Sequence, residues 1–152
     1  MLKDQRDLLA ALNAHGVKYL VIGGHAVSIH ADPRGTKDLD VFIKADEENS
    51  KAVFAALAGY GAPLAGMTPA DFNDKATTVF QLGVEPGRVD ILQGIAGVTF
   101  DEAWENRVEK LLDGQTPAHV ISREHLIQNK LAVGRLQDLA DVEKLRETAL
   151  EK

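Results

Sequence analysis

The chain has 152 residues, of which 45% are hydrophobic and 26% charged, and its formal net charge at pH 7 is −6. These values predict a single domain over residues 1–152 with a buried core, and they argue against a broad nucleic-acid-binding surface. The absence of cysteine excludes disulfides, thiolate metal ligands and thiol catalysis, and the lack of a signal-peptide pattern or a membrane-length apolar run favours a cytoplasmic location.

The first third of the chain predicts alternating helices and strands. Leu8, Leu9 and Leu12 recur at helical spacing, and the apolar run that follows is bounded by Gly16 and Gly23. Asp46 is a good N-cap for a later helix that the glycines at 59 and 61 would stop. We therefore expect, in order, a helix over 3–14, a strand over 17–22, a short helix over 24–30, a strand over 38–43 and a helix over 47–58.

The rest of the chain predicts a loop, two hairpins and closing helices. Residues 62–75 are rich in Gly, Pro, Asn and Asp, which is typical of a loop. Strands are expected over 77–82 and 88–92, joined by a hairpin-length turn, and Asp113-Gly114 predicts a second hairpin whose Pro117 suggests an edge strand. Helix N-caps are indicated at Thr99 and Ser122, and a last helix is expected over 135–150.

Two acids mark the strand over 38–43. If Asp38 and Asp40 lie in a strand, the side-chain period of two places both carboxylates on one face. Like charges about 4 Å apart repel by roughly 4 kcal/mol at the effective dielectric of a protein surface, so such a pair calls for a bridging cation. Mg²⁺ suits this role because it combines one or two carboxylates with phosphate oxygens. The pair therefore indicates a magnesium site.

A glycine pair stands between the preceding strand and the short helix. Gly23 and Gly24 have no Cβ atoms, so a ligand can approach their backbone closely. The helix that follows would present unpaired N–H groups and the positive end of its dipole to an anion. We expect phosphate at the glycines and metal at the acids, in one site.

The order of strand, Gly-Gly, short helix and Asp-Leu-Asp-Val resembles the signature of the nucleotidyltransferase superfamily related to DNA polymerase β. A later Asp completes the metal-binding triad of that family, and Asp90 in Arg88-Val89-Asp90-Ile91 matches it. The segment 121–131, with Gly134-Arg135, Asp138 and Asp141, resembles the closing helices of the bacterial branch that includes AbiEii-type toxins. The resemblance implies an α/β (α+β) nucleotidyltransferase fold, a small mixed sheet flanked by helices with further helices at the C-terminus.

The activity that this resemblance implies is transfer of a nucleoside monophosphate from a nucleoside triphosphate to an acceptor hydroxyl, with Mg²⁺ or Mn²⁺ as cofactor. The catalytic and metal-binding residues would be Asp38, Asp40 and Asp90, with Asp90 as general base. The backbone of Gly23 and Gly24 would hold the phosphates, although many family members carry Ser where Gly24 stands.

Three further residues are candidates for phosphate contacts. Arg34 and Thr36 lie just before the acids, where a surface charge and a turn hydroxyl are equally good interpretations. Lys130 would point into the cleft, whereas Arg135 and Asp138 have the spacing of an ordinary helix ion pair.

The sequence leaves the acceptor open. One hypothesis is a toxin-antitoxin or stress enzyme that modifies an RNA end, such as that of tRNA, or a partner protein. A second is an enzyme that transfers the nucleotide to a small molecule such as an antibiotic. A third is a non-catalytic nucleotide-binding or antitoxin module that keeps the fold and the acids.

Overall fold

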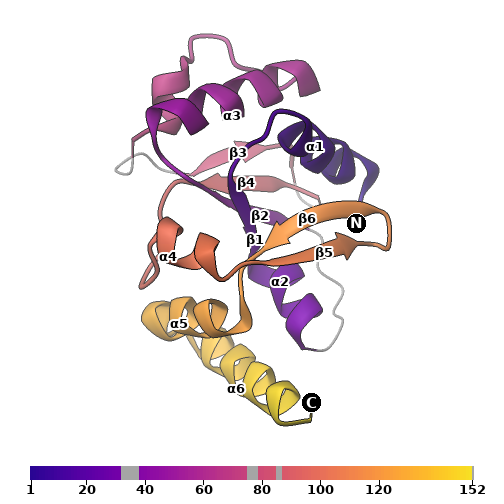
Figure 1. Ribbon diagram of the computed structural model, residues 1–152, viewed down its shortest axis with the longest axis vertical. Coiled ribbons are helices and arrows are strands. Elements are labelled where there is room, and N and C mark those ends of the chain that lie inside the picture. Colours follow the sequence, from indigo (N-terminus) through magenta and orange to yellow (C-terminus); the bar gives the residue numbers. More distant parts are fainter. Residues whose placement is uncertain (32–37, 75–78, 85–86, 152) are drawn as a thin grey trace.

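The computed structural model describes residues 1–31, 38–74, 79–84 and 87–151 (Figure 1). Helices and strands alternate through most of this part of the chain. In chain order the elements are α1 (Lys3–Ala14), β1 (Tyr19–Ile22), α2 (Gly23–His30), β2 (Leu39–Ile43), α3 (Glu47–Tyr60), the 3₁₀ helix η1 (Pro69–Phe72), β3 (Phe80–Leu82), β4 (Val89–Leu92), α4 (Phe100–Glu105), β5 (Val108–Leu112), β6 (Thr116–Val120), α5 (Arg123–Val133) and α6 (Leu136–Glu151).

The strands form one mixed sheet in the order β3-β4-β2-β1-β6-β5. The pairs β1–β2, β3–β4 and β5–β6 are antiparallel, and the pairs β2–β4 and β1–β6 are parallel. Strands β2 and β1 lie at the centre, and their residues are almost completely buried. Such a run of buried residues is expected where both faces of a sheet are covered.

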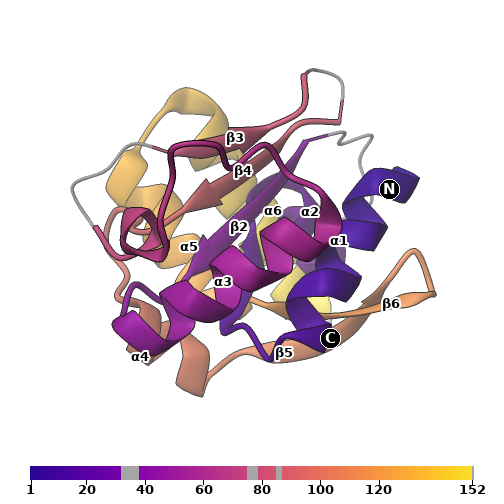
Figure 2. The same cartoon turned by 90° about the horizontal axis from the view of Figure 1, so that it is seen from above.

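Helices cover both faces of the sheet (Figures 1 and 2). Helices α1 and α3 pack together on one face, and α2 packs on the other face against β1, β2, α5 and α6. Leu8, Leu9 and Leu12 of α1, together with Val53 and Leu57 of α3, are fully buried, as the helical spacing predicted.

The predicted helix starts are confirmed by their caps. Asp46 accepts a hydrogen bond from the Asn49 N–H (2.7 Å), and Ser122 accepts one from the His125 N–H (3.2 Å). Thr99 caps α4 in the same way through Glu102. These signals are local, so the sequence alone was sufficient to place them.

Several boundaries differ from the sequence prediction. Helix α3 continues through Gly59 and ends at Gly61, whose φ of 100° gives the left-handed C-cap. Strand β2 begins at Leu39, so Asp38 stands immediately before the strand rather than in it. The loop predicted over 62–75 contains η1, because Pro69 starts a turn in which Asp71 accepts a hydrogen bond from the Thr68 N–H (2.8 Å).

The prediction that Pro117 marks an edge strand is wrong. Pro117 lies in β6, which is between β1 and β5, and the edges are β3 and β5. Proline is tolerated here because β1 pairs with β6 only at Val21 and Val120, beyond Pro117.

Among the helices in the described ranges, none is both long and apolar enough to span a bilayer.

Candidate active site

The turn from β1 into α2 is shaped by the contact between Gly23 and Asp40. Gly23 has φ 67°, in the left-handed region that favours glycine. A Cβ atom built at Gly23 would collide with the carboxylate of Asp40. The side chain of Asp40 therefore lies directly against the backbone at the start of α2, and Asp40 is on the sheet face that α2 covers.

The parallel pairing of β2 and β4 brings the acids together. Asp40 and Asp90 are direct neighbours in the register of the two strands, although they are far apart in the sequence. Asp38 lies next to them, one residue before β2. The side chains of Asp38 and Asp90 are 31% and 15% exposed, so all three carboxylates lie at an accessible but partly desolvated place.

Arg88 lies among these acids, and the sequence prediction missed it. Its Nε donates to Oδ1 of Asp90 (2.9 Å), its Nη2 donates to Oδ2 of Asp90 (3.3 Å), and Nη2 is 3.9 Å from Oδ2 of Asp38. The available signal was spacing, since a residue two positions before Asp90 shares its face of a strand. Asp38 also accepts hydrogen bonds from the backbone N–H groups of Gly87 (3.2 Å) and Arg88 (3.0 Å).

The surroundings of Asp40 shift the pKa of its carboxyl group. Burial raises the pKa of Asp40 to about 6, with the negative charges of Asp90 and Asp38 adding to the effect and the charge of Arg88 opposing it. The guanidinium therefore only partly neutralises the acids. A site with excess negative charge favours a bound cation.

The donor set fits a hard divalent ion, but its side chains are arranged around Arg88. Carboxylates on neighbouring strands are ligands that Mg²⁺ and Mn²⁺ accept. Within the described ranges, no group of three or more histidine or acidic side chains has the arrangement of a metal site. Asp90 is turned to Arg88, and one oxygen of Asp38 is turned to the backbone before β4. Metal binding by all three would require these oxygens to exchange partners.

The first turn of α2 lies beside these acids. Its N-cap residue, Ile22, offers no hydrogen-bonding side chain, and no side chain among the described residues caps the helix. The first N–H groups of α2, which include those of Gly23 and Gly24, start beside the Asp40 carboxylate. An anion bound at this turn would thus lie next to a cation held by the acids.

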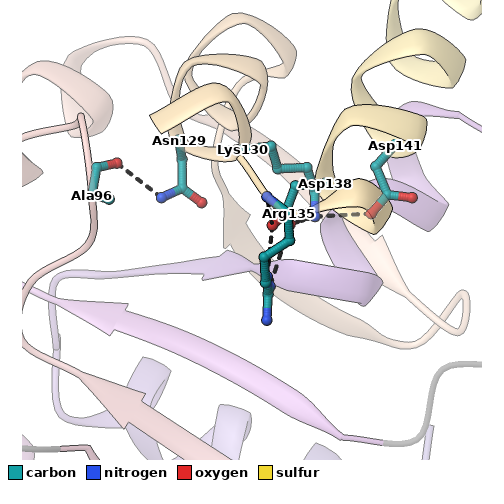
Figure 3. Close-up of polar contacts among 6 residues, drawn as sticks. All are labelled: Ala96, Asn129, Lys130, Arg135, Asp138 and Asp141. Atoms are coloured by element: carbon teal, nitrogen blue, oxygen red, sulfur yellow. Dashed lines mark hydrogen bonds and ion pairs between the residues drawn. The ribbon is translucent and has the colours of Figure 1, made fainter. Parts of the chain in front are cut away.

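The structure places Lys130 between α5 and α6 (Figure 3). Its Nζ is 2.9 Å from Oδ2 of Asp141 and 3.4 Å from Oδ1 of Asp138, and its side chain is 11% exposed. Arg135 holds Asp138 from the other side, with Nε 2.7 Å from Oδ2. The predicted ion pair of Arg135 and Asp138 is therefore present, and it belongs to a larger, mostly buried network that includes Lys130. Arg34 and Thr36 lie outside the residues that the structure describes.

The fold and this group of residues define a nucleotidyltransferase-like protein, and comparison with known proteins agrees. The chain belongs to the family described as "Nucleotidyltransferase of unknown function (DUF6036)", whose model matches residues 2–149. It is thereby a member of the nucleotidyltransferase superfamily and a transferase by family, as the sequence resemblance predicted. No curated protein sequence matches the chain.

Solved structures share the fold, and they include the following two. One is the lincosamide antibiotic adenylyltransferase LnuA in a lincomycin-bound crystal, with a TM-score of 0.61 and 16% identity, covering 97% of this chain and 98% of that one. The other is a candidate nucleotidyltransferase from Thermotoga maritima, with a TM-score of 0.57 and 17% identity, covering 100% of this chain and 97% of that one. At such low identity the likeness establishes the fold alone.

Proposed function

We propose that this protein transfers a nucleoside monophosphate from a nucleoside triphosphate to an acceptor hydroxyl at the site formed by Asp38, Asp40 and Asp90. The observation that carries the proposal is the pairing of Asp40 with Asp90 directly beside the first turn of α2. A carboxylate cluster with excess negative charge next to a row of backbone N–H groups suits a metal-bound triphosphate.

Each group at the site has a distinct part in the reaction. Backbone N–H groups at Gly23 and Gly24 would hold the β- and γ-phosphates, while Asp38, Asp40 and Asp90 would hold Mg²⁺ or Mn²⁺. The bound metal would supply positive charge at the α-phosphate and at the leaving pyrophosphate. The acceptor oxygen forms a bond to the α-phosphorus, the bond to the bridging oxygen breaks, and pyrophosphate leaves with the electron pair. Asp90 receives the hydroxyl proton.

Arg88 has to leave Asp90 for this chemistry. Its guanidinium occupies both oxygens of Asp90, whereas the reaction needs them for metal and proton. We propose that the arriving triphosphate draws Arg88 away, because guanidinium pairs with phosphate oxygens in the same forked geometry as with a carboxylate. Lys130, Arg34 and Thr36 remain predicted phosphate contacts, and the toxin-antitoxin role remains a prediction from the sequence.

Calorimetry tests this function directly. Each of the four ribonucleoside triphosphates is titrated with Mg²⁺ into the wild type, the double variant Asp38→Asn/Asp40→Asn and the control Glu47→Gln, which removes an 81% exposed carboxylate on α3. We expect metal-dependent binding of at least one triphosphate in the wild type and the control, and its loss in the double variant. Equal binding by the double variant, or no binding by the wild type, would reject the proposed site.

A further inference from the structure

A pocket lies at the ends of the two strands that carry the acids. Phe42 follows Asp40 at the next alternate position of β2, Lys44 comes directly after β2, and Gly94 is the second residue after β4. Residues two apart in a strand point to the same face and are separated by about 6.6 Å. The pocket has a volume of about 290 Å³ and is lined by Phe42, Lys44, Ala45, Gln93, Gly94, Ile95, Val98, Thr99, Phe100 and Asp101.

The floor of this pocket is apolar. The rings of Phe42 and Phe100 pack edge to face with centroids 5.1 Å apart, and both residues are buried. Val98 is also buried, whereas Ile95 is a partly buried lining residue. An apolar floor with a few polar groups at the rim is the usual composition of a small-molecule site.

The walls of the pocket are held in place by side chains from other elements. Asn129 of α5 donates to the carbonyl of Ala96 (2.9 Å; Figure 3), and Gln128 donates to that of Gly97 (2.5 Å). Gln93 donates to the carbonyl of Asp71 (2.6 Å) and accepts from the Asp74 N–H (2.6 Å). The loop after β4 is thus fixed on both sides, so the pocket is formed before a ligand arrives.

The charges at and beside the rim are more negative than positive, because Lys44 and Asp101 of the lining are joined by Asp46, which contacts Lys44 from outside the lining. Lys44 is the lining cation among the described residues, and its Nζ is 3.0 Å from Oδ1 of Asp101 and 3.8 Å from Oδ2 of Asp46. One ammonium therefore faces two carboxylates, and the side chain of Asp101 is 76% exposed. Such a rim repels a phosphate-rich chain and favours a neutral or cationic ligand.

We propose that this pocket binds the acceptor, and that the acceptor is a neutral or cationic small molecule with an apolar body and a hydroxyl group. The inference rests on the proposed nucleotidyl transfer. A molecule that contacts Phe42 has its near end about one strand repeat, roughly 6.6 Å, from Asp40, whose register partner on the neighbouring strand is Asp90. The triphosphate approaches from the neighbouring strand β1, through Gly23 and Gly24. Donor and acceptor thus reach the acids from different directions, with the acceptor hydroxyl turned toward the α-phosphorus.

Gly94 offers a clean way to close the pocket. Within the described part of the chain, no atom lies within 4 Å of a Cβ atom at this glycine, and its φ is not in the left-handed region. Gly94→Phe therefore adds an aromatic ring at the pocket lining without backbone strain and changes none of the three acids. Ala55→Phe, on an exposed position of α3, is the matched control for an added aromatic ring.

Binding to the pocket is measured without nucleotide. Phenylalaninol and 3-phenyllactate share an aromatic body and a hydroxyl but carry opposite charges, and each is titrated into methyl-labelled protein by NMR. We expect phenylalaninol to shift the methyl signals of Ile95 and Val98, and phenyllactate to bind roughly fivefold more weakly. Gly94→Phe should abolish these shifts and Ala55→Phe should keep them. No shift at Ile95 and Val98, equal or tighter binding of phenyllactate, or displacement of phenylalaninol by Mg²⁺ with α,β-methylene ATP would overturn the proposal.

Group transfer is then followed with α-³²P-labelled triphosphate and three cell fractions: small molecules, total RNA and protein. We expect a new labelled product, distinct from the triphosphate, in the small-molecule fraction. This product should be lost in Gly94→Phe, although that variant still binds triphosphate. Label in RNA or protein, or in no fraction while triphosphate binds, refutes the acceptor class and leaves the triphosphate site standing. If the wild type binds no triphosphate, the proposed function fails, and the NMR titration still decides whether the pocket binds its probes.

Discussion

Gly23 and Asp40 constrain each other through space. Gly23 is required both by its positive φ and by the carboxylate that lies where its Cβ would be. Gly16 has a similar φ, 64°, but among the described residues no atom lies within 4 Å of a Cβ built there. Alanine at Gly16 therefore tests backbone strain alone, whereas alanine at Gly23 tests backbone strain together with the collision with Asp40.

We expect Gly16→Ala to lower the free energy of unfolding by about 1 kcal/mol, the cost of a left-handed alanine. Gly23→Ala should cost roughly 1–3 kcal/mol more and abolish metal-dependent triphosphate binding, because Asp40 must move. Urea denaturation gives the free energies and calorimetry the binding. Equal losses of stability in the two variants would show that the contact with Asp40 is unimportant.

Asp40 should make the metal-free protein less stable as the pH rises. Its pKa is about 6 in the folded protein, against 3.8 for an ordinary aspartate carboxyl. Below about pH 4 the carboxyl is protonated in both states and the effect is absent. Between about pH 4 and 6 the free energy of unfolding falls because the carboxyl ionises in the unfolded chain while the buried one keeps its proton, and above about pH 6 the loss is complete.

Replacing Asp40 by Asn removes this ionisation. With a chelator present, we expect Asp40→Asn to unfold with a free energy ~1–2 kcal/mol higher than wild type at pH 7.5, allowing for the partial exposure of the site, and with little difference at pH 4. Asp101→Asn, at a 76% exposed carboxylate, serves as control. A less stable Asp40→Asn at pH 7.5 would contradict the assigned direction of the pKa shift.

At the scale of elements, the contact between α5 and α6 depends on charge. Lys130 lies between Asp138 and Asp141, and all three residues are buried. Buried ion pairs cost desolvation on both sides, so they add little stability as a whole but are expensive to break. Arg135 differs, because its side chain is 76% exposed where it pairs with Asp138.

We expect Lys130→Met to lower the free energy of unfolding by about 3 kcal/mol, since it removes the ammonium partner of two buried carboxylates. Arg135→Ala should cost about 1 kcal/mol or less, because an exposed ion pair contributes little. Thermal and urea denaturation of both variants provide the comparison. Similar losses for the two variants would mean that burial of Lys130 does not govern the stability of this contact.

At the scale of the whole molecule, the protection of backbone amides from hydrogen exchange should decrease from the centre of the sheet to its edges. Strands β1 and β2 have partners on both sides, whereas the edge strand β3 is three residues long. Amides of Tyr19–Ile22 and Leu39–Ile43 should exchange only through global unfolding. Amides of Phe80–Leu82 should exchange at least about 10²-fold faster through local opening, as measured by hydrogen exchange. Uniform protection across the sheet would argue against this hierarchy.

The sequence by itself determined most elements and the candidates for the site. The caps at Asp46, Thr99 and Ser122, the leucine spacing of α1 and the alternation around Asp40 act over a few residues, so each could be recognised locally. The family resemblance added Asp90 from a distant strand, and the parallel register of β2 and β4 places it beside Asp40.

Only the tertiary structure decided which charges meet. Arg88 at the acids, the two carboxylates around Lys130 and the internal position of Pro117 depend on which strands and helices become neighbours. That pairing is selected by burial of apolar surface over the whole chain, to which charged side chains contribute little. The pocket beyond Asp40 and Asp90 arises in the same way, from residues of two strand ends and a loop that have no shared pattern in the sequence.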